Sequence, residues 1–203
     1  MISGYQPSVT RQTILDAAFR AVYSNGFRST SLNQILAQTG LSKGALYHHF
    51  PNKQALGQAL IAQLNESVDA MFLLPLQAYE NPVEGLLETI GNAFDGLSPE
   101  EIQTGCPVNN LAAEMTSVDG EFQSKLAALY QRWSDTYAAA LAEGQKSGFV
   151  STDINSFDAG SFIVGSLAGS RSLAASTGDI KHLEACRRGL EGFIESLKHR
   201  AEA

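Results

Sequence analysis

Apolar residues recur every three or four positions along most of the chain, which is the spacing of one face of an α-helix. No run alternates between apolar and polar residues for long enough to indicate a β-strand. The pattern therefore predicts an all-α protein. The expected helices cover about 10–24, 32–39, 43–50, 53–74, 83–97, 106–117, 122–147, 156–175 and 179–199, and 98–105 is expected to be a loop.

The first three helices are short and have clear end signals. Gly26 and Gly40 stand where the first and second helices should stop, because glycine readily adopts the left-handed conformation of a C-terminal cap. Thr30 or Ser31 is placed to cap the start of the second helix, and Ser42 that of the third. These signals predict two short helices joined by a tight turn at Gly40.

The third of these helices has one apolar face and one polar face. Ala45, Leu46 and Phe50 share the side that should pack on the first helix. The outward positions are then Ser42, Lys43, Gly44, Tyr47 and His48. A core position for Tyr47 is the alternative, since its face is deduced from periodicity alone.

Glycine inside a helix costs about 1 kcal/mol relative to alanine. The presence of Gly44 inside a helix therefore needs an explanation in packing or in contact with a partner. Close approach to a partner surface is one such explanation. His48 and His49 are not expected to bind a metal together, because adjacent helical residues point about 100° apart.

Charge is divided unevenly along the chain. The whole protein carries a formal charge of -7, yet the first 60 residues contain five basic residues and one acidic residue. Attraction to the phosphates of a nucleic acid depends on local charge rather than on the total. The basic end is therefore the candidate nucleic-acid surface.

The stretch from Thr30 to Leu56, TSLNQILAQTGLSKGALYHHFPNKQAL, closely resembles the signature of the TetR family of transcriptional regulators. The resemblance extends over about residues 10–60, and GCPVNNLAAEM at Gly105–Met115 is similar, more weakly, to a segment from one branch of that family. It implies a helix-turn-helix DNA-binding domain at 1–52, followed by an all-α effector-binding and dimerisation domain at 53–203.

The resemblance also assigns roles within the basic end. Lys43, Ala45 and His48 would lie nearest the base edges in the major groove, while Thr30, Tyr47 and Lys53 would hold phosphates. The predicted DNA-binding residues are Thr30, Ser42, Lys43, Gly44, Ala45, Tyr47, His48 and Lys53. A plain helical hairpin with a solvated basic face is the alternative.

Small residues gather on the penultimate helix, where another helix could approach closely. Together with the apolar stripe of the last helix, they suggest a homodimer built as a four-helix bundle, and hence a palindromic operator in double-stranded DNA. The predicted dimerisation residues are Ser161, Gly165, Gly169, Leu183, Leu190, Phe193 and Ile194. The alternative is that these two helices simply cover their own core.

The helix expected at 106–117 has an apolar side and a small polar side, and either could face a ligand pocket. Pockets are mainly apolar with a few placed polar groups, so a mostly hydrophobic or aromatic effector is preferred. The predicted pocket residues are Phe94, Cys106, Asn109, Asn110, Met115, Trp133 and Tyr137. Each of the aromatic residues could instead be plain core.

Cys106 and Cys186 are the only cysteines in the chain, and their separation fits neither a disulfide framework nor a zinc site. Cys106 begins a helix, where the helix dipole can lower a thiol pKa. A regulator that senses oxidants or electrophiles at Cys106 is therefore one alternative function. Burial of Cys106 as a small apolar side chain is the simpler interpretation.

The resemblance implies repression that an effector relieves. Effector binding would tilt the helix at 53–74 and change the spacing of the two reading helices. A ligand-free architectural DNA-binding protein is the alternative from a different class. Catalysis is not expected, because no histidine lies between His49 and His182 and no cysteine–histidine pair is evident. No cofactor and no metal are expected.

No segment offers about 18 consecutive apolar residues, so no membrane association is expected. The first seven residues lack the basic start and apolar core of a signal peptide. These features predict a cytoplasmic location.

Overall fold

A computed structural model describes residues 7–117 and 119–199 of the 203-residue chain. Six of the seven residues on which the signal-peptide argument rested lie outside this part. Ten α-helices make up most of the described residues, together with a π-helical turn and a 3₁₀ turn. Beyond one isolated bridge between Val150 and Lys198, the described residues form no β-structure. The expected all-α fold is confirmed.

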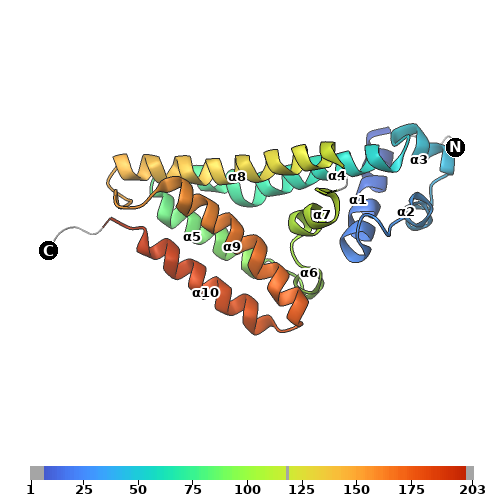
Figure 1. Cartoon of the computed structure of the whole chain (residues 1–203). Helices are drawn as coiled ribbons and strands as arrows, with labels where there is room; N and C mark the ends of the chain where they lie inside the picture. Colours follow the sequence, from blue (N-terminus) through green and yellow to red (C-terminus); the bar gives the residue numbers. More distant parts are fainter. Residues whose placement is uncertain (1–6, 118, 200–203) are drawn as a thin grey trace.

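Helices α1 (Pro7–Asn25), α2 (Leu32–Thr39) and α3 (Lys43–His49) form a unit at one end of the molecule (Figure 1). Ile14, Ile35 and Leu46, one from each helix, are buried in its centre. Ser31 rather than Thr30 caps α2, in a capping box with Gln34. The turn to α3 passes through Gly40 at φ +66°, a conformation that favours glycine.

Helix α4 (Lys53–Val68) leads from this unit into the body and contacts both α1 and α8. The helix predicted at 53–74 is wrong at its end, because regular α-helix stops at Val68. A π turn, η1 (Asp69–Leu73), follows, in which the Leu74 N–H donates to the Asp69 carbonyl at 2.8 Å. A 3₁₀ turn, η2 (Pro75–Ala78), then starts at a proline that has no N–H to continue the helix.

Three helices fill the middle of the chain: α5 (Pro82–Asp95), α6 (Pro99–Thr104) and α7 (Pro107–Met115). The loop predicted at 98–105 is wrong, since most of it is α6. The Ser98 side chain accepts from the Glu101 N–H, and the Glu101 carboxylate accepts from the Ser98 N–H. This capping box satisfies two backbone donors and makes a helix of six residues possible.

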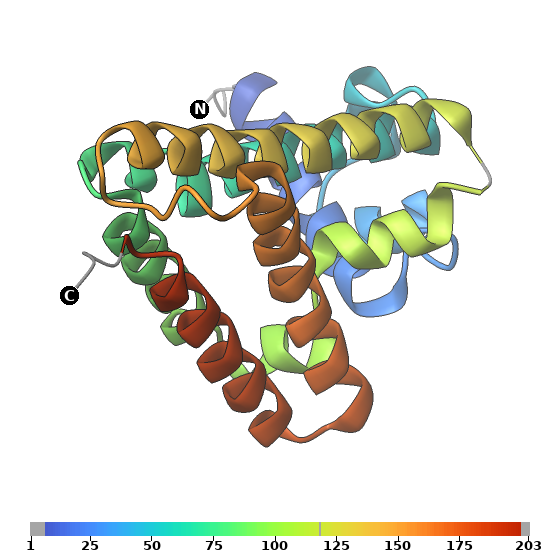
Figure 2. The same ribbon diagram turned by 60° about the vertical axis from the view of Figure 1, so that its left-hand side comes forward.

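The remaining helices are α8 (Gly120–Lys146), α9 (Ser156–Thr177) and α10 (Ile180–Ser196). Helix α8 runs beside α4 along the length of the body, and α9 lies between α8 and α10 (Figures 1 and 2). Gly160 permits the close packing of α9 on α8, because a Cβ there would lie 2.9 Å from the Ser134 carbonyl oxygen. None of the helices within 7–117 and 119–199 has the length and apolar character of a membrane span.

Candidate functional site

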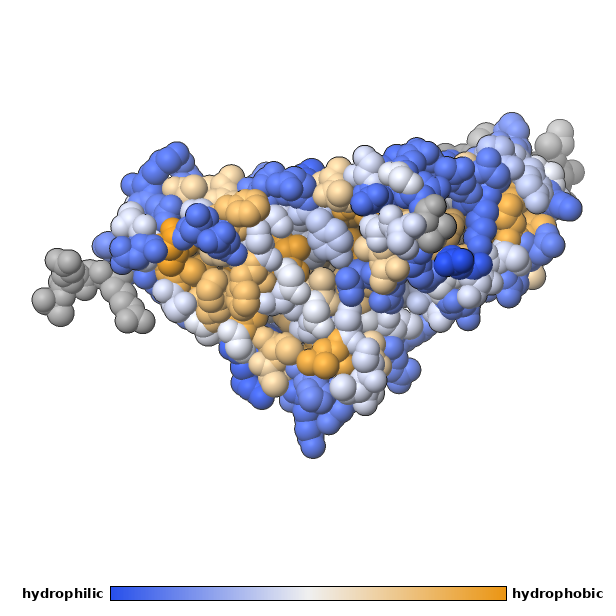
Figure 3. Space-filling model, in the orientation of Figure 1, coloured by the Kyte–Doolittle hydropathy of each residue, from blue (hydrophilic) through white to orange (hydrophobic). Residues whose placement is uncertain are grey.

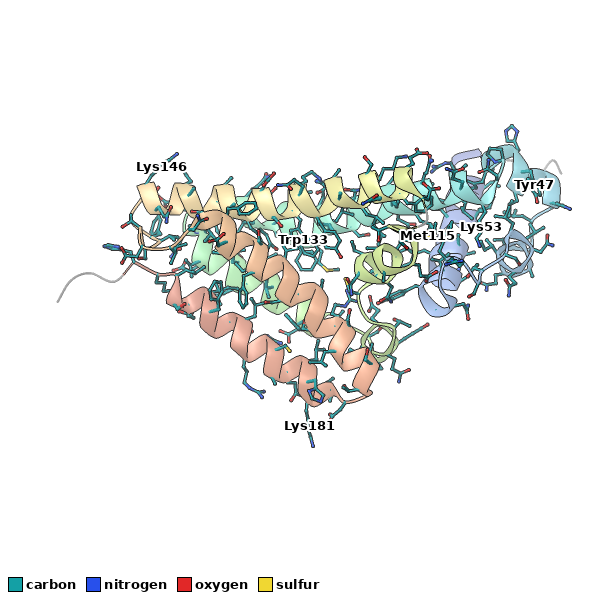
Figure 4. All side chains as sticks on the ribbon, viewed as in Figure 1. Tyr47, Lys53, Met115, Trp133, Lys146 and Lys181 are labelled. Carbon is teal, nitrogen blue, oxygen red and sulfur yellow. The ribbon has the colours of Figure 1, made fainter. Side chains whose placement is uncertain are left out.

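Helix α3 presents a polar face at the tip of the molecule. Leu46 and Phe50 are buried, and Ala45 is half-buried against the neighbouring helices. Tyr47 is 42% exposed and lies at the outer end (Figure 4), so the alternative that placed it in the core is wrong. The exposed residues are Ser42, Lys43, Gly44, Tyr47 and His48, as the periodicity indicated.

The start of α3 is ordered by local contacts. The Ser42 hydroxyl accepts from the Ala45 N–H at 3.2 Å, which caps the helix. The Lys43 ammonium lies 5.7 Å from the centre of the Tyr47 ring. A Cβ on Gly44 would meet only the Ser42 hydroxyl oxygen, at 3.9 Å, so no packing within the chain requires glycine at this position.

Thr30 does not have the position expected of a phosphate ligand. Its side chain is buried, and its hydroxyl lies 2.8 Å from the Gly26 carbonyl oxygen and 3.2 Å from that of Ala21. The hydroxyl proton is thus used to hold the turn between α1 and α2. The assignment of Thr30 as a phosphate-holding side chain is wrong for this reason, and Ser31 is the exposed residue at that helix start.

Lys53 is half-buried at the start of α4. Its ammonium donates to the Arg28 carbonyl at 3.0 Å and lies 4.9 Å from the centre of the Phe27 ring. Burial lowers the pKa of Lys53, although the nearby Glu114 carboxylate acts in the opposite direction. Lys53 therefore braces the turn after α1, and any phosphate it contacts must share its ammonium with that turn.

Glu114 of α7 is the second residue that holds this turn. Its carboxylate accepts from the N–H groups of Phe27 at 3.2 Å and Arg28 at 3.0 Å. Gly26 makes the approach possible, because a Cβ there would lie 2.5 Å from the carboxylate and its φ is +84°. Sequence reasoning missed this contact, which joins the helix-turn-helix unit to the body.

A cavity of about 220 Å³ lies between that unit and the body. Its walls come from α1, α4, η1, α5, α6, α7, α8 and α9. Phe94, Cys106 and Trp133 line it, as predicted. Lining residues that sequence reasoning missed include Phe19, Tyr23, Leu64, Met71, Phe72, Leu167 and Arg171.

Four of the predicted pocket residues do not line this cavity. Asn109 donates to the Ser172 hydroxyl at 2.9 Å, and Asn110 donates to the Thr104 carbonyl at 2.7 Å, so both amides serve to fix α7. Met115 and Tyr137 are buried in the core away from the cavity. Their assignment to this cavity is wrong, because periodicity shows which face is inward but not which inward residues border a void.

The polar end of the cavity joins three distant parts of the chain. The Tyr23 hydroxyl of α1 donates to the Gly105 carbonyl, and Arg171 of α9 donates to the Tyr23 oxygen at 2.8 Å. Burial raises the pKa of Tyr23. Neutral tyrosine therefore links the first helix to the body at the cavity wall.

Cys106 is buried at the start of α7 and borders the same cavity. This burial favours its interpretation as a small apolar side chain. No group of three or more histidine, cysteine, aspartate or glutamate residues that could hold a metal ion occurs within the described ranges.

The last two helices divide the predicted dimerisation residues into two sets. Leu183, Leu190 and Ile194 are buried within the chain's own core, so their assignment to an interface is wrong. Gly165 and Gly169 are exposed, and a Cβ on either would meet no atom within 4 Å. Ser161 and Phe193 are half-buried.

The outward face of α9 and α10 carries exposed apolar side chains. The rings of Phe162 and Phe193 meet there with centres 4.5 Å apart, and Phe162 is 52% exposed. Figure 3 shows white and orange surface over these helices, with hydrophilic residues around it. Exposed residues on the two helices that are small or apolar include Phe162, Gly165, Gly169, Leu173, Ala185, Gly189 and Gly192.

Two family models match the chain. Residues 14–60 match the bacterial regulatory proteins of the tetR family, and residues 82–190 match the tetracyclin repressor-like C-terminal domain. The first match contains α2, α3 and the turn between them. The second contains most of the helices that surround the cavity.

Individual relatives agree with these matches. The transcriptional regulator LmrA of Bacillus subtilis is 30% identical over 66% of this chain and 72% of its own length. The regulator UidR of Escherichia coli K12 is 31% identical over 72% of this chain and 71% of its own length.

Solved structures show the same fold. A TetR-family regulator from Cytophaga hutchinsonii superimposes with a TM-score of 0.84 at 18% identity, covering 98% of this chain and 100% of its own. GusR of Salmonella enterica gives 0.72 at 26% identity, covering 94% and 98%. The chain belongs to the TetR family of DNA-binding transcriptional regulators.

Proposed function

We propose that this protein is a repressor that leaves a palindromic operator when a small, mainly apolar molecule binds in the cavity. The observation that carries the proposal is the cavity's position, since Phe19 and Tyr23 of α1 share its wall with residues of α5, α7, α8 and α9. A ligand there touches both the helix-turn-helix unit and the body. The same position argues against a ligand-free architectural role.

The exposed face of α3 is the proposed reader of DNA. Lys43 and His48 supply donors for base edges or phosphates, and the half-exposed Ala45 methyl suits a thymine methyl. Tyr47 lies beside them and offers its hydroxyl to a phosphate. Ser42 and Gly44 add little bulk, so the helix can approach the groove floor closely.

A homodimer is the proposed unit of binding. The outward face of α9 and α10 offers glycines that let a partner helix approach and phenylalanines that it would cover. Two copies related by a two-fold axis would place two α3 helices on one side of a duplex, which is why the operator is expected to be palindromic. The proposed domain boundary falls between 52 and 53, where α4 begins. A cytoplasmic location accords with access to DNA.

Release from the operator requires the cavity to act on α3. The ligand would contact α4 through Leu64 and Val68, and α7 through Val108. Helix α7 in turn holds the turn after α1 through Glu114. A ligand that binds one arrangement of these helices more tightly would change the distance between the two α3 helices of the dimer. A coupling free energy of about 1–3 kcal/mol between ligand binding and DNA binding is typical of such switches.

The test is selection of bound sequences from random duplex DNA by the purified protein at physiological salt. Recovery of a palindrome is expected, and its affinity should fall steeply with salt, because phosphate contacts release counterions. Enrichment of no sequence above non-specific background would overturn the proposal. A reporter gene behind the recovered operator then separates repression from activation.

A thiol sensor at Cys106 is the second candidate. Its support is the position of Cys106 at the start of α7 on the cavity wall. Burial of the thiol weighs against it, because oxidants act on accessible thiolates. Replacing Cys106 with serine and measuring operator release by hydrogen peroxide tests this candidate, since a release that depends on the thiol should be lost in the variant. Equal responses of the two proteins to peroxide would exclude it.

A further inference from the structure

Arg171 contributes a positive charge to the mainly apolar cavity. The residue lies on α9 and lines the cavity together with apolar side chains such as Phe72, Phe94 and Leu167. No carboxylate within the described part of the chain lies close enough to form an ion pair with it. A half-buried guanidinium without an ion-pair partner at a cavity wall is costly unless something else satisfies it.

The unused donor of Arg171 is specific. Its Nη2 donates to the Tyr23 hydroxyl at 2.8 Å, whereas its Nε is buried and has no hydrogen-bond partner. Nε and Nη2 form the edge of a guanidinium that carboxylates bind with two parallel hydrogen bonds. Half of that edge therefore lacks a hydrogen-bond partner, and Nη2 still carries a second proton.

Glu101 does not pair with the unused Nε donor of Arg171. It also borders the cavity, and the charge of Arg171 contributes to lowering its pKa. Its carboxylate, however, accepts from the Ser98 N–H at 2.9 Å and the Ser98 hydroxyl at 2.8 Å, which fixes the start of α6. The acidic side chain beside Arg171 is thus committed to a helix cap.

Trp133 also lines the cavity, but its indole N–H interacts with the buried Tyr137 hydroxyl rather than with the cavity. The unpaired Nε of Arg171 is therefore the donor that favours a molecule with acceptor atoms.

We propose that the cavity binds a small amphipathic carboxylate, whose anionic end pairs with the incompletely hydrogen-bonded Nε–Nη2 edge of Arg171 while its apolar body packs among the phenylalanines. The inference rests on the proposed ligand-binding role of the cavity and adds the chemical class of the ligand. A carboxylate at this edge competes with the Tyr23 hydroxyl for Arg171, and Tyr23 belongs to the first helix of the DNA-binding unit. Binding of a negatively charged ligand would thereby weaken the contact that holds α1 against α9.

The experiment uses matched acids and amides. 3-Phenylpropanoate, 4-phenylbutanoate and octanoate are each titrated into the full-length protein without DNA at pH 7, beside their primary amides. Trp133 is the only tryptophan in the chain and lines the cavity, so its fluorescence reports occupancy directly. At least one acid should bind about tenfold or more tightly than its amide, since charge-assisted hydrogen bonds are stronger than neutral ones.

Two variants test whether Arg171 causes the preference for acids. Arg171→Met keeps an unbranched apolar stem and should abolish the preference for acid over amide, while Arg171→Lys should retain part of it through its charge. Lys146→Met is the matched control, because it removes a positive charge from an exposed side chain at the far end of α8 (Figure 4). The acid preference of this control should equal that of the natural protein, and thermal melting verifies that each variant is folded.

Several outcomes overturn the proposal. It is wrong if no acid of the series alters Trp133 fluorescence, if acids and amides bind alike, or if the preference survives in a folded Arg171→Met protein. Because these titrations contain no DNA, such a result leaves the selection of an operator unaffected. Failure to select an operator would in turn leave the acid preference intact.

Discussion

The Glu114 carboxylate lies 3.2 Å from the backbone nitrogen of Phe27 and accepts its N–H, although 87 positions separate the two residues. The second carboxylate oxygen accepts the next N–H along the chain, that of Arg28, at 3.0 Å. The turn between α1 and α2 thus depends on α7, a helix whose other end borders the cavity. This contact joins a helix that borders the cavity to the helix-turn-helix unit.

Glu114→Gln should weaken this contact. An amide has one acceptor oxygen and no charge, so one of the two N–H groups loses its partner, and a loss of about 1 kcal/mol in the free energy of unfolding is expected. Urea unfolding measures the loss, and Glu66→Gln on the exposed side of α4 is the control. A variant as stable as the natural protein would show that the contact does not hold the turn.

Gly44→Ala should separate stability from DNA binding. Alanine fits the space at Gly44 and favours the helix, so the free energy of unfolding should rise by up to about 1 kcal/mol. Operator affinity should fall, because the added methyl group stands on the proposed reading face. Gly120→Ala, another exposed helical position with no atom within 4 Å of a built Cβ, should leave operator affinity unchanged.

Lys43→Ala and Lys53→Ala should weaken DNA binding in different ways. Loss of the exposed Lys43 should also relax sequence preference, whereas loss of Lys53 should weaken all sequences alike. Lys53→Ala should in addition lower the melting temperature, since its ammonium holds the Arg28 carbonyl. Affinities for operator and random duplexes measure both effects, and unchanged selectivity of Lys43→Ala would contradict the assignment of α3 as the reader.

Gly169→Arg should dissociate the proposed dimer without unfolding the chain. The position is exposed and open, so an arginine fits the monomer but not a closely packed partner helix. Sedimentation velocity should show a monomer, while Ala139→Arg on the exposed side of α8 should remain a dimer. Equal sedimentation of the two variants would place the interface elsewhere.

Tyr137→Phe should reduce the loss of stability at alkaline pH. Burial raises the pKa of Tyr137 above the value of about 10 expected in the unfolded chain. Since the unfolded state then loses its proton first, the natural protein loses stability as pH rises through and beyond that value. Between pH 8 and pH 10.5, the free energy of unfolding measured in urea should decrease less for the variant than for the natural protein. Equal decreases would contradict a raised pKa of Tyr137.

Local sequence patterns were sufficient for most of the helices and for the exposed face of α3. The spacing of Ala45, Leu46 and Phe50 indicated which side of α3 is inward, because side-chain direction along a helix depends only on its 3.6-residue period. The end signals at Gly26, Gly40 and Ser42 were equally local. The capping box of Ser98 and Glu101 was also visible in the sequence and could have predicted α6.

The cavity and its links depend on the tertiary structure. Tyr23 and Arg171 are 148 positions apart, and their contact exists only because α1, α6 and α9 pack together. Periodicity likewise could not show that Leu183 and Ile194 face the chain's own core while Gly165 and Gly169 remain open. The sequence by itself determined the helices and the faces they bury, since both follow from interactions within a few residues. Tertiary packing alone decided which buried faces meet, where they leave a void, and which polar groups border it.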